Sequence, residues 1–313
     1  MNKLHSPNLY TSTTFNISRC FMLLGFVLIF QVVGQFVGIS FLTFYANIPS
    51  EKITSVMKNP ANTPNIWLGL MELQGIFGII AFILSGVCFW KIIERKPLSE
   101  LFYEKKANQK SLVLIFFLMI TIMPLIATIG YYNKTMALPS YLHDIEIWIK
   151  EKEVDLGRMS VFLTNFSSFV GYLLGVIVIA LIPSIGEEII FRGLFQRYFS
   201  YIFKNKHIAI WATAFLFSAI HFQFYGFFPR LLLGALLGYI YQKTGSLVTA
   251  IWGHFLNNFI AISGIYFLKG SNLALDSSKS QKPDWIIVIV FSMLAFFVYD
   301  QFKKANIKTI DFE

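Results

Sequence analysis

Two adjacent carboxylates occur at the end of a long apolar stretch. Glu187 and Glu188 are followed by Arg192 in the segment Pro183-Ser-Ile-Gly-Glu-Glu-Ile-Ile-Phe-Arg. Glu188 and Arg192 are four residues apart, so on a helix they share a face and can form an ion pair. Glu187 is rotated about 100° away, because a helix has 3.6 residues per turn. The spacing therefore predicts two roles, with Glu188 held ionised by Arg192 and Glu187 left to accept a proton.

Two further motifs place histidines and an amide within apolar segments. His221 ends the segment Phe217-Ser-Ala-Ile-His, and His254 is followed four residues later by Asn258, on the same helical face. A charged group at the centre of a membrane helix costs roughly 2.5 to 3.5 kcal/mol on insertion scales, so several such groups together indicate a site. Each motif also has a structural interpretation, as carboxylates that reach the membrane surface or as polar side chains that join helices.

These residue types fit the hydrolysis of a peptide bond. The reaction needs a base for water, a proton donor for the leaving nitrogen, and hydrogen-bond donors for the developing oxyanion. Glu187 and His221 can supply the first two functions. His254 and Asn258 can supply the third, because an imidazole and an amide on one helical face can both donate to one oxygen.

The composition is that of an integral membrane protein. Of 313 residues, 56% are hydrophobic and only 14% are charged, whereas a soluble domain carries about 25% charged residues. A helix needs about 20 mostly apolar residues to cross the hydrocarbon core. We therefore predict an all-α fold, a polytopic membrane helical bundle of about eight transmembrane helices. The predicted spans are Phe21 to Ala46, Ile66 to Trp90, Ser111 to Tyr131, Val161 to Ile185, Ile208 to Phe224, Phe227 to Tyr241, Leu247 to Leu268 and Trp285 to Tyr299.

The motifs concentrate the predicted chemistry in the C-terminal half. The expected organisation is a cytoplasmic N-terminal segment (1–20), N-terminal transmembrane helices and loops (21–160), a catalytic core (161–268), and a last transmembrane helix with a cytoplasmic tail (269–313). Between the third and fourth spans, Ile145 to Asp155 mixes charged residues with apolar ones. This pattern fits an amphipathic helix at the membrane interface and a solvated loop equally well.

The charge distribution predicts a location and partners. The net charge is +9, and lysine and arginine favour the cytoplasmic side of a membrane. They are more numerous in the segments that lie inside if both termini are cytoplasmic. We therefore predict a multi-pass protein of the cell membrane with both termini in the cytoplasm. The basic residues lie beside membrane helices rather than on a binding module, so we expect anionic lipid headgroups as partners and no nucleic acid.

The three motifs together resemble the signature of a known family. EEIIFR, FSAIH and HFLNN are similar to the motifs E-E-x-x-x-R, F-x-x-x-H and H-x-x-x-N of the CAAX protease and bacteriocin-processing (CPBP) family of intramembrane proteases, in the same order. The resemblance spans about Leu181 to Asn258. It implies an intramembrane endopeptidase whose substrate is a membrane-associated peptide or protein tail.

The resemblance also implies a role for each residue. Water would be activated by Glu187 and His221, and the oxyanion would be stabilised by His254 and Asn258. The supporting residues that it implies are Glu188, Arg192 and Phe217. It requires no cofactor or metal. Zinc is an alternative, since the set Glu187, His221 and His254 suits the nitrogen and oxygen preferences of that ion.

The predicted spans do not bring these residues together. With 1.5 Å per residue, Glu187 lies near the inner end of its span, whereas His221 lies about 20 Å along the next. Either the fourth helix begins later, near Ser168, or the boundaries around Ile208 are different.

Two other functions are compatible with the residue pattern. A proton-coupled transporter could use the glutamates and histidines as a relay, although such transporters need broken helices in both halves of the chain and only the C-terminal half is polar here. A non-catalytic scaffold would need none of the motif residues. The intact motifs favour the enzyme.

Overall fold

The computed structural model describes residues 12–45, 47–102, 107–269 and 282–306, and the regular structure of these residues is helical. The first part of the expected N-terminal segment and the end of the expected C-terminal tail lie outside them. The long helices and the ones that build the site are α1 (Thr13–Tyr45), α3 (Ile66–Gly78), α6 (Gln109–Thr135), α7 (His143–Leu163), α8 (Phe169–Gly175), α9 (Ile182–Glu188), α10 (Gln196–Phe203), α11 (Lys206–Ala219), α12 (Phe227–Thr244), α13 (Leu247–Phe267) and α14 (Trp285–Ala305). The short ones are η2 (Ser50–Lys52), α2 (Ile53–Lys58), η3 (Pro60–Asn62), η4 (Ile79–Leu84), α4 (Ser85–Cys88), η5 (Phe89–Ile93), α5 (Leu98–Phe102), η6 (Ser140–Leu142), η7 (Val176–Leu181), η8 (Ile189–Phe195) and η9 (Phe224–Gly226). The prediction of an all-α fold is confirmed.

Seven helical segments of the described chain are long and apolar enough to cross a membrane. They are Thr13–Phe44, Ile66–Ile93, Gln109–Thr135, Phe169–Phe203, Phe224–Thr244, Leu247–Phe267 and Trp285–Ala305. The polytopic bundle is therefore confirmed, with about the predicted number of spans. The remaining predicted span, the fifth (Ile208 to Phe224), corresponds to α11, which has 14 residues and is too short to meet the same criterion.

The fourth span begins later than the sequence suggested. The predicted start at Val161 lies in the last turns of α7, and the new helix begins at Phe169. Ser168 caps it, because the Ser168 side chain accepts a hydrogen bond from the Gly171 N–H at 3.0 Å. The helix then continues to Phe203, so Glu187 lies in its middle rather than at its end. Of the two ways to bring the site together, a later start near Ser168 is confirmed.

The boundaries of the fifth predicted span are also different. It was expected to run to Phe224, but α11 ends at Ala219 and the chain turns at Phe222, which has a positive φ of 51°. The turn is held by the Ser218 hydroxyl, which donates to the Phe227 carbonyl oxygen at 2.7 Å. His221 therefore lies in the connection between α11 and η9, not within a membrane helix.

The helix that carries the glutamates is irregular in two places. Between α8 and α10, the π-helical segments η7 and η8 flank α9. Pro183 at the start of α9 has no N–H, so the regular hydrogen-bond ladder is interrupted there. Glu188 is the last residue of α9, and π-helical turns of this kind are frequent at functional sites.

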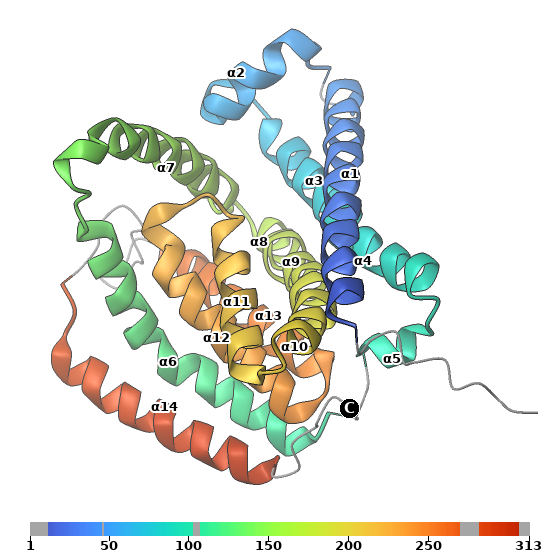
Figure 1. Cartoon of the computed structure of the whole chain (residues 1–313). Coiled ribbons are helices and arrows are strands. Elements are labelled where there is room, and N and C mark those ends of the chain that lie inside the picture. Colours follow the sequence, from blue (N-terminus) through green and yellow to red (C-terminus); the bar gives the residue numbers. More distant parts are fainter. Residues whose placement is uncertain (1–11, 46, 103–106, 270–281, 307–313) are drawn as a thin grey trace, which may run out of the picture.

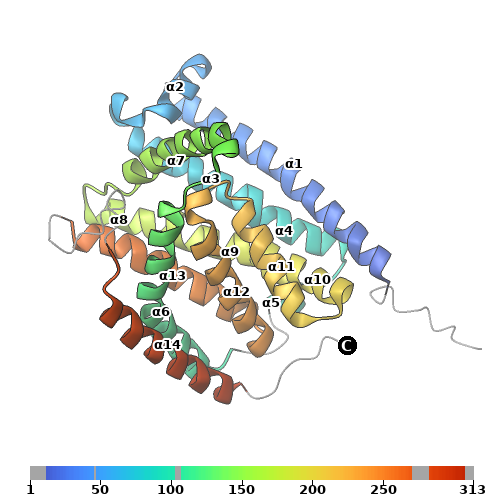
Figure 2. The same ribbon diagram turned by 60° about the vertical axis from the view of Figure 1, so that its left-hand side comes forward.

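The bundle surrounds this irregular helix. Helices α6 and α14 lie side by side at one edge, and α1 lies against α3 and η4 at another (Figures 1 and 2). Between them α13 packs against α9, α12 and α6, and α11 packs against α12 and α10. One buried core cluster includes Phe191, Leu194, Phe217 and Ala250, which lie close to the predicted catalytic residues in sequence. The core therefore fixes the helices that carry the three motifs.

Helix α7 crosses one end of the bundle (Figure 1). It includes the segment Ile145 to Asp155, so the helical alternative for that segment is confirmed. Trp148 is 51% exposed and Val154 is 58% exposed. Glu153 accepts a hydrogen bond from the Tyr225 N–H at 3.0 Å, which ties α7 to the turn that follows His221. An interfacial position for α7 stays a prediction.

Candidate active site

Glu188 is the central acceptor of a buried polar network. Its side chain is fully buried, and its Oε1 atom accepts hydrogen bonds from Arg192 Nη1 at 2.5 Å and from His254 Nδ1 at 2.8 Å. The predicted helical pair of Glu188 and Arg192 is therefore present. The other carboxylate oxygen, Oε2, is buried and has no hydrogen-bond partner in the described part of the chain. A buried polar network is rigid when its charges are paired, because its groups have no water to replace their partners.

Arg192 connects three helical segments. Its Nη2 atom donates to the carbonyl oxygen of Gly234 on α12 at 2.8 Å. Its guanidinium lies over the ring of Phe217 on α11, with 5.0 Å from Cζ to the ring centroid. Gly234 allows this close approach, because a Cβ atom there would lie 3.2 Å from the Phe217 ring and 3.3 Å from Ala214. One turn further on, the Gln196 side-chain amide donates to the Gly238 carbonyl oxygen at 3.1 Å in the same way.

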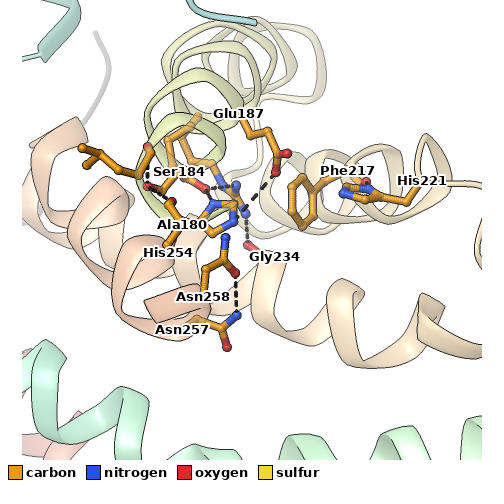
Figure 3. A network of polar contacts seen from close by, with 12 residues as sticks. Ala180, Ser184, Glu187, Phe217, His221, Gly234, His254, Asn257 and Asn258 are labelled. Atoms are coloured by element: carbon orange, nitrogen blue, oxygen red, sulfur yellow. Dashed lines mark hydrogen bonds and ion pairs between the residues drawn. The ribbon is translucent and has the colours of Figure 1, made fainter. Parts of the chain in front are cut away.

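Glu187 differs from Glu188 in exposure and in partners. Its side chain is 14% exposed, compared with 0% for Glu188. Its Oε2 atom lies 3.8 Å from His254 Nε2, and no hydrogen bond holds it in the described structure. Figure 3 shows its carboxylate turned toward the side on which Phe217 and His221 lie. Glu187 is therefore the carboxylate that remains available to a reactant.

The hydrogen bond of His221 fixes which of its nitrogens carries the proton. His221 Nδ1 lies 2.7 Å from the carbonyl oxygen of Phe217. A carbonyl only accepts, so Nδ1 must donate. In a neutral imidazole the other nitrogen, Nε2, then has a free lone pair. His221 lies within electrostatic reach of Glu187, His254 and Arg230, so its lone pair is available at the same site as the Glu187 carboxylate.

His254 is oriented by the same principle. Its Nδ1 atom lies 2.8 Å from the Glu188 Oε1 atom, which also accepts a hydrogen bond from the Arg192 guanidinium, and a carboxylate in such an ion pair accepts. Nδ1 of His254 thus donates, and Nε2 faces Glu187. When Nε2 is also protonated, His254 can donate a hydrogen bond to a developing oxyanion, with the Glu188 carboxylate balancing the added charge.

Asn258 is oriented by its neighbour. Its Oδ1 atom accepts a hydrogen bond from Asn257 Nδ2 at 3.1 Å. The amide nitrogen of Asn258 is consequently turned toward His254 (Figure 3). The geometry leaves an N–H donor, rather than an acceptor, facing the site. An N–H group in this place suits a negatively charged oxygen.

The structure brings together all of the residues that the motifs singled out. Glu188 and Arg192 form the buried pair, Phe217 packs between Arg192, His221 and His254, and Glu187 lies beside His254. Asn257 is part of the HFLNN motif, but the spacing of the motif assigned it no role. The sequence signal for a role of Asn257 is its position directly before Asn258. Two adjacent amides can hydrogen-bond when one side chain is turned toward the other, and this bond then fixes the orientation of both.

Arg230 is a second residue that the motifs did not indicate. Its guanidinium donates to the side-chain oxygen of Gln223 at 2.7 Å and to the Gln223 carbonyl oxygen at 2.8 Å. It lies within electrostatic reach of Glu187 and Glu153. Arg230 thus holds the turn after His221 against the first turn of α12 and adds a positive charge near Glu187. No sequence motif links it to the site, because it belongs to the tertiary contact between that turn and α12.

The donor atoms of Glu187, His221 and His254 suit a zinc ion, but their positions in the structure do not form a metal site. Both histidines use Nδ1 for a hydrogen bond, which leaves Nε2 for a metal as in many metalloenzymes. Among the described residues, however, no group of three or more His, Cys, Asp or Glu side chains is close enough together to hold a metal ion. We therefore derive the chemistry from the side chains alone.

The fold and the site define a membrane-embedded helical protein with a buried Glu, His and Asn cluster. Residues 169–260 match the model of the family described as Type II CAAX prenyl endopeptidase Rce1-like. The matched segment begins with α8 and ends two residues after Asn258, so it contains all three motifs. The resemblance to the CAAX protease family that the motifs indicated is thereby confirmed for this segment.

A comparison with individual proteins gives a relative of low sequence identity. A protein of Bacillus subtilis (strain 168), the uncharacterized protein YpbD, is 28% identical over 96 residues, which are 29% of this chain and 46% of that protein. The chain thus matches a little less than half of the length of this relative. No solved structure matches the chain.

Proposed function

We propose that the protein is an intramembrane endopeptidase that hydrolyses a peptide bond in a membrane-associated peptide or protein tail. The observation that carries the proposal is the contrast within the glutamate pair. Glu188 is buried and hydrogen-bonded to Arg192 and His254, whereas Glu187 is partly exposed and not hydrogen-bonded in the described structure. A structural pair would have no reason to leave one carboxylate unsatisfied at the centre of a membrane helix.

In the proposed reaction, Glu187 and His221 activate the attacking water. A water molecule between the Glu187 carboxylate and the His221 Nε2 lone pair donates a hydrogen bond to each. Its oxygen attacks the carbonyl carbon of the scissile bond, and Glu187 takes the proton that is released. Protonated Glu187, or His221 after proton transfer, then gives that proton to the leaving nitrogen, and the C–N bond breaks. A positioned acid or base contributes typically 10²- to 10⁴-fold to such a step.

The developing oxyanion is stabilised by the third motif. The amide N–H of Asn258 and the protonated Nε2 of His254 donate to the tetrahedral oxygen. These donors are already held in place by Asn257 and by Glu188. Donors that need no reorganisation are worth more in a site from which water is excluded, and loss of one typically costs about 10²- to 10³-fold in rate.

The substrate, location and lipid partners follow from the membrane setting. Seven apolar helices support a multi-pass membrane protein, and we propose the cell membrane, with both termini in the cytoplasm. A site in mid-helix favours a substrate that is itself held in the bilayer. Lysine residues next to membrane helices, such as Lys204 and Lys243, suit anionic lipid headgroups as a further partner.

Cleavage by the purified protein tests the proposal. Fluorogenic peptides with a membrane anchor are incubated with wild type, Glu187→Gln and His221→Ala in detergent or liposomes. Glu72→Gln is the matched control, because Glu72 lies in the membrane helix α3 and has none of the site residues as a hydrogen-bond partner. We expect cleavage by wild type and by the control, and at least a hundredfold slower cleavage by the two site variants.

Two further arms separate the alternatives. Cleavage that survives a chelator supports the metal-free mechanism, and cleavage that a chelator abolishes and zinc restores contradicts it. If Glu187→Gln retains full biological function, a scaffold is supported instead. If no variant or wild type cleaves any peptide but wild type moves protons across liposomes, the transporter is supported.

A further inference from the structure

Helix α1 carries two glutamines in the middle of its apolar stretch. Gln31 lies about ten residues after Phe21, and Gln35 lies about ten residues before Phe44. Phe21 and Phe44 are near the two ends of this stretch. At 1.5 Å per residue this distance is about 15 Å, half of the hydrocarbon thickness of about 30 Å. Both side chains are therefore placed near the centre of the bilayer. This is where a polar group finds no water.

Neither glutamine is satisfied within the described chain. No hydrogen bond involves the Gln31 or Gln35 side chain, and Gln35 is exposed on the outside of the bundle. The contact of α1 with α3 and η4 lies next to the glutamines, because Gly34 lies against Ile80 and Gly38 lies against Leu73. The small residues of α1 thus serve this contact, and the glutamines lie along its edge, where Gln35 is exposed.

The two amides line an open groove along α1. The groove has a volume of about 1240 Å³. It is lined by Gln31, Val32, Gln35, Phe36, Ile39, Ser40, Thr43, Phe44, Asn47, Ser50 and Phe77. Val32 is 71% exposed and Phe36 is 72% exposed, so apolar side chains flank the amides. A mostly apolar groove that contains amide side chains suits another transmembrane helix better than lipid tails, which cannot form hydrogen bonds.

We propose that this groove binds helix α1 of a second copy of the chain, so that the protein forms a twofold homodimer in the membrane. A glutamine amide carries both donors and an acceptor, so it is complementary to an identical amide. A twofold interface brings the same patch of both copies together. Gln31 and Gln35 of one copy then hydrogen-bond with the same two residues of the other. Gln31 and Gln35 are four residues apart and share a helical face, as such a pairing needs.

Cysteine cross-linking in native membranes tests the interface. The variant Val32→Cys, in a background of Cys20→Ala and Cys88→Ala, places a thiol in the groove. Val37→Cys in the same background is the matched control, because Val37 is 40% exposed on α1 at a similar depth but does not line the groove. Under mild oxidation we expect a cross-linked species of twice the monomer mass with Val32→Cys, at least fivefold more abundant than with Val37→Cys.

Removing the amides tests why the copies associate. Gln31→Leu/Gln35→Leu in the Val32→Cys background keeps the side-chain size and suits the hydrocarbon, so the chain still inserts. Interhelical hydrogen bonds in membranes are modest, and loss of those between two pairs of amides is expected to lower the cross-linked fraction about tenfold. Gln31→Asn/Gln35→Asn retains the amides and should keep a larger fraction than the leucine variant.

Several results would overturn the proposal. These are equal cross-linking of Val32→Cys and Val37→Cys, a cross-linked fraction that the leucine substitutions leave unchanged, or a cross-linked species with the mass of a different partner. Helical content and elution of the detergent-solubilised leucine variant serve as a check that it is folded. None of these measurements requires proteolytic activity, so they are independent of the proposed reaction.

Discussion

Glu188 and His254 are 66 residues apart in sequence, yet Glu188 Oε1 accepts a hydrogen bond from His254 Nδ1 at 2.8 Å. The same oxygen accepts from Arg192. The first and third motifs are therefore joined through one carboxylate, which sets the orientation of His254 and leaves its Nε2 atom facing Glu187. The two adjacent glutamates consequently have separable roles, and the predictions below begin from that difference.

Glu188→Gln should affect stability as well as activity, whereas Glu187→Gln should affect activity alone. Removing the charge of Glu188 leaves the fully buried Arg192 without its partner, and breaking a buried pair in this way costs about 3 to 5 kcal/mol. Thermal unfolding in detergent should show a large fall in Tm for Glu188→Gln and almost none for Glu187→Gln. Equal Tm changes in the two variants would contradict this division of roles.

Arg192→Lys should be destabilising although it keeps the positive charge. The two terminal nitrogens of the Arg192 guanidinium donate separately to Glu188 and to the Gly234 carbonyl oxygen, and its plane lies over the Phe217 ring. A lysine ammonium has a single nitrogen and no plane, so it cannot make all three contacts. We expect a loss of about 2 kcal/mol, in the range of a hydrogen bond to a charged group, measured by denaturant unfolding. Arg197→Lys is the comparison, since Arg197 is less buried and should give the smaller effect. If Arg192→Lys were as stable as wild type, the contacts that only the guanidinium can make would not contribute to stability.

His221→Asn should separate the fold from the chemistry. The asparagine amide N–H can replace Nδ1 as donor to the Phe217 carbonyl oxygen, but it has no atom in the place of Nε2. We expect unchanged Tm and cleavage that is at least a hundredfold slower, as for loss of a positioned base. Turnover near the wild-type rate would mean that His221 acts only through its hydrogen bond to Phe217.

Asn257→Asp should lower turnover more than Asn257→Leu. A carboxylate only accepts, so it draws the amide N–H of Asn258 toward itself and away from the site, whereas leucine removes the hydrogen bond without reversing it. For Asn257→Leu we expect about a fivefold fall in kcat, in keeping with about 1 kcal/mol for one hydrogen bond, with little change in KM. Asn257→Ser supplies a hydroxyl donor and should recover part of the rate. Equal kcat for all three variants would remove Asn257 from the positioning of Asn258.

Much of this architecture could be predicted from the sequence. The apolar runs gave the seven spans to within a few residues at most ends, since a membrane helix is defined by composition and length. The Glu188 and Arg192 pair followed from a spacing of four residues, and the placement of His254 and Asn258 on one face followed from the same rule. These are local properties, which a periodic helix carries within its own segment.

The failures of prediction were at the ends of helices. The start of the fourth helix depended on the cap at Ser168, and the end of α11 depended on the bond from Ser218 to the Phe227 carbonyl oxygen. An apolar run continues on both sides of each of these points. Hydropathy alone therefore placed the fourth helix too early and extended the fifth too far, and this separated Glu187 from His221.

The sequence by itself determined the class of fold, the membrane setting and the identity of the residues that assemble into the site. Only the tertiary structure decided which glutamate is buried, which nitrogen of each histidine carries its proton, and which end of the Asn258 amide faces the site. The physical reason is that these choices depend on hydrogen-bond partners that spacing does not identify. His254 comes to Glu188 from another helix, whereas the Phe217 carbonyl for His221 and Asn257 for Asn258 are close in sequence but are brought into place by the turn after α11 and by the side-chain conformations on α13. Spacing along one helix selects a face, whereas the partners present in the folded chain select a single atom.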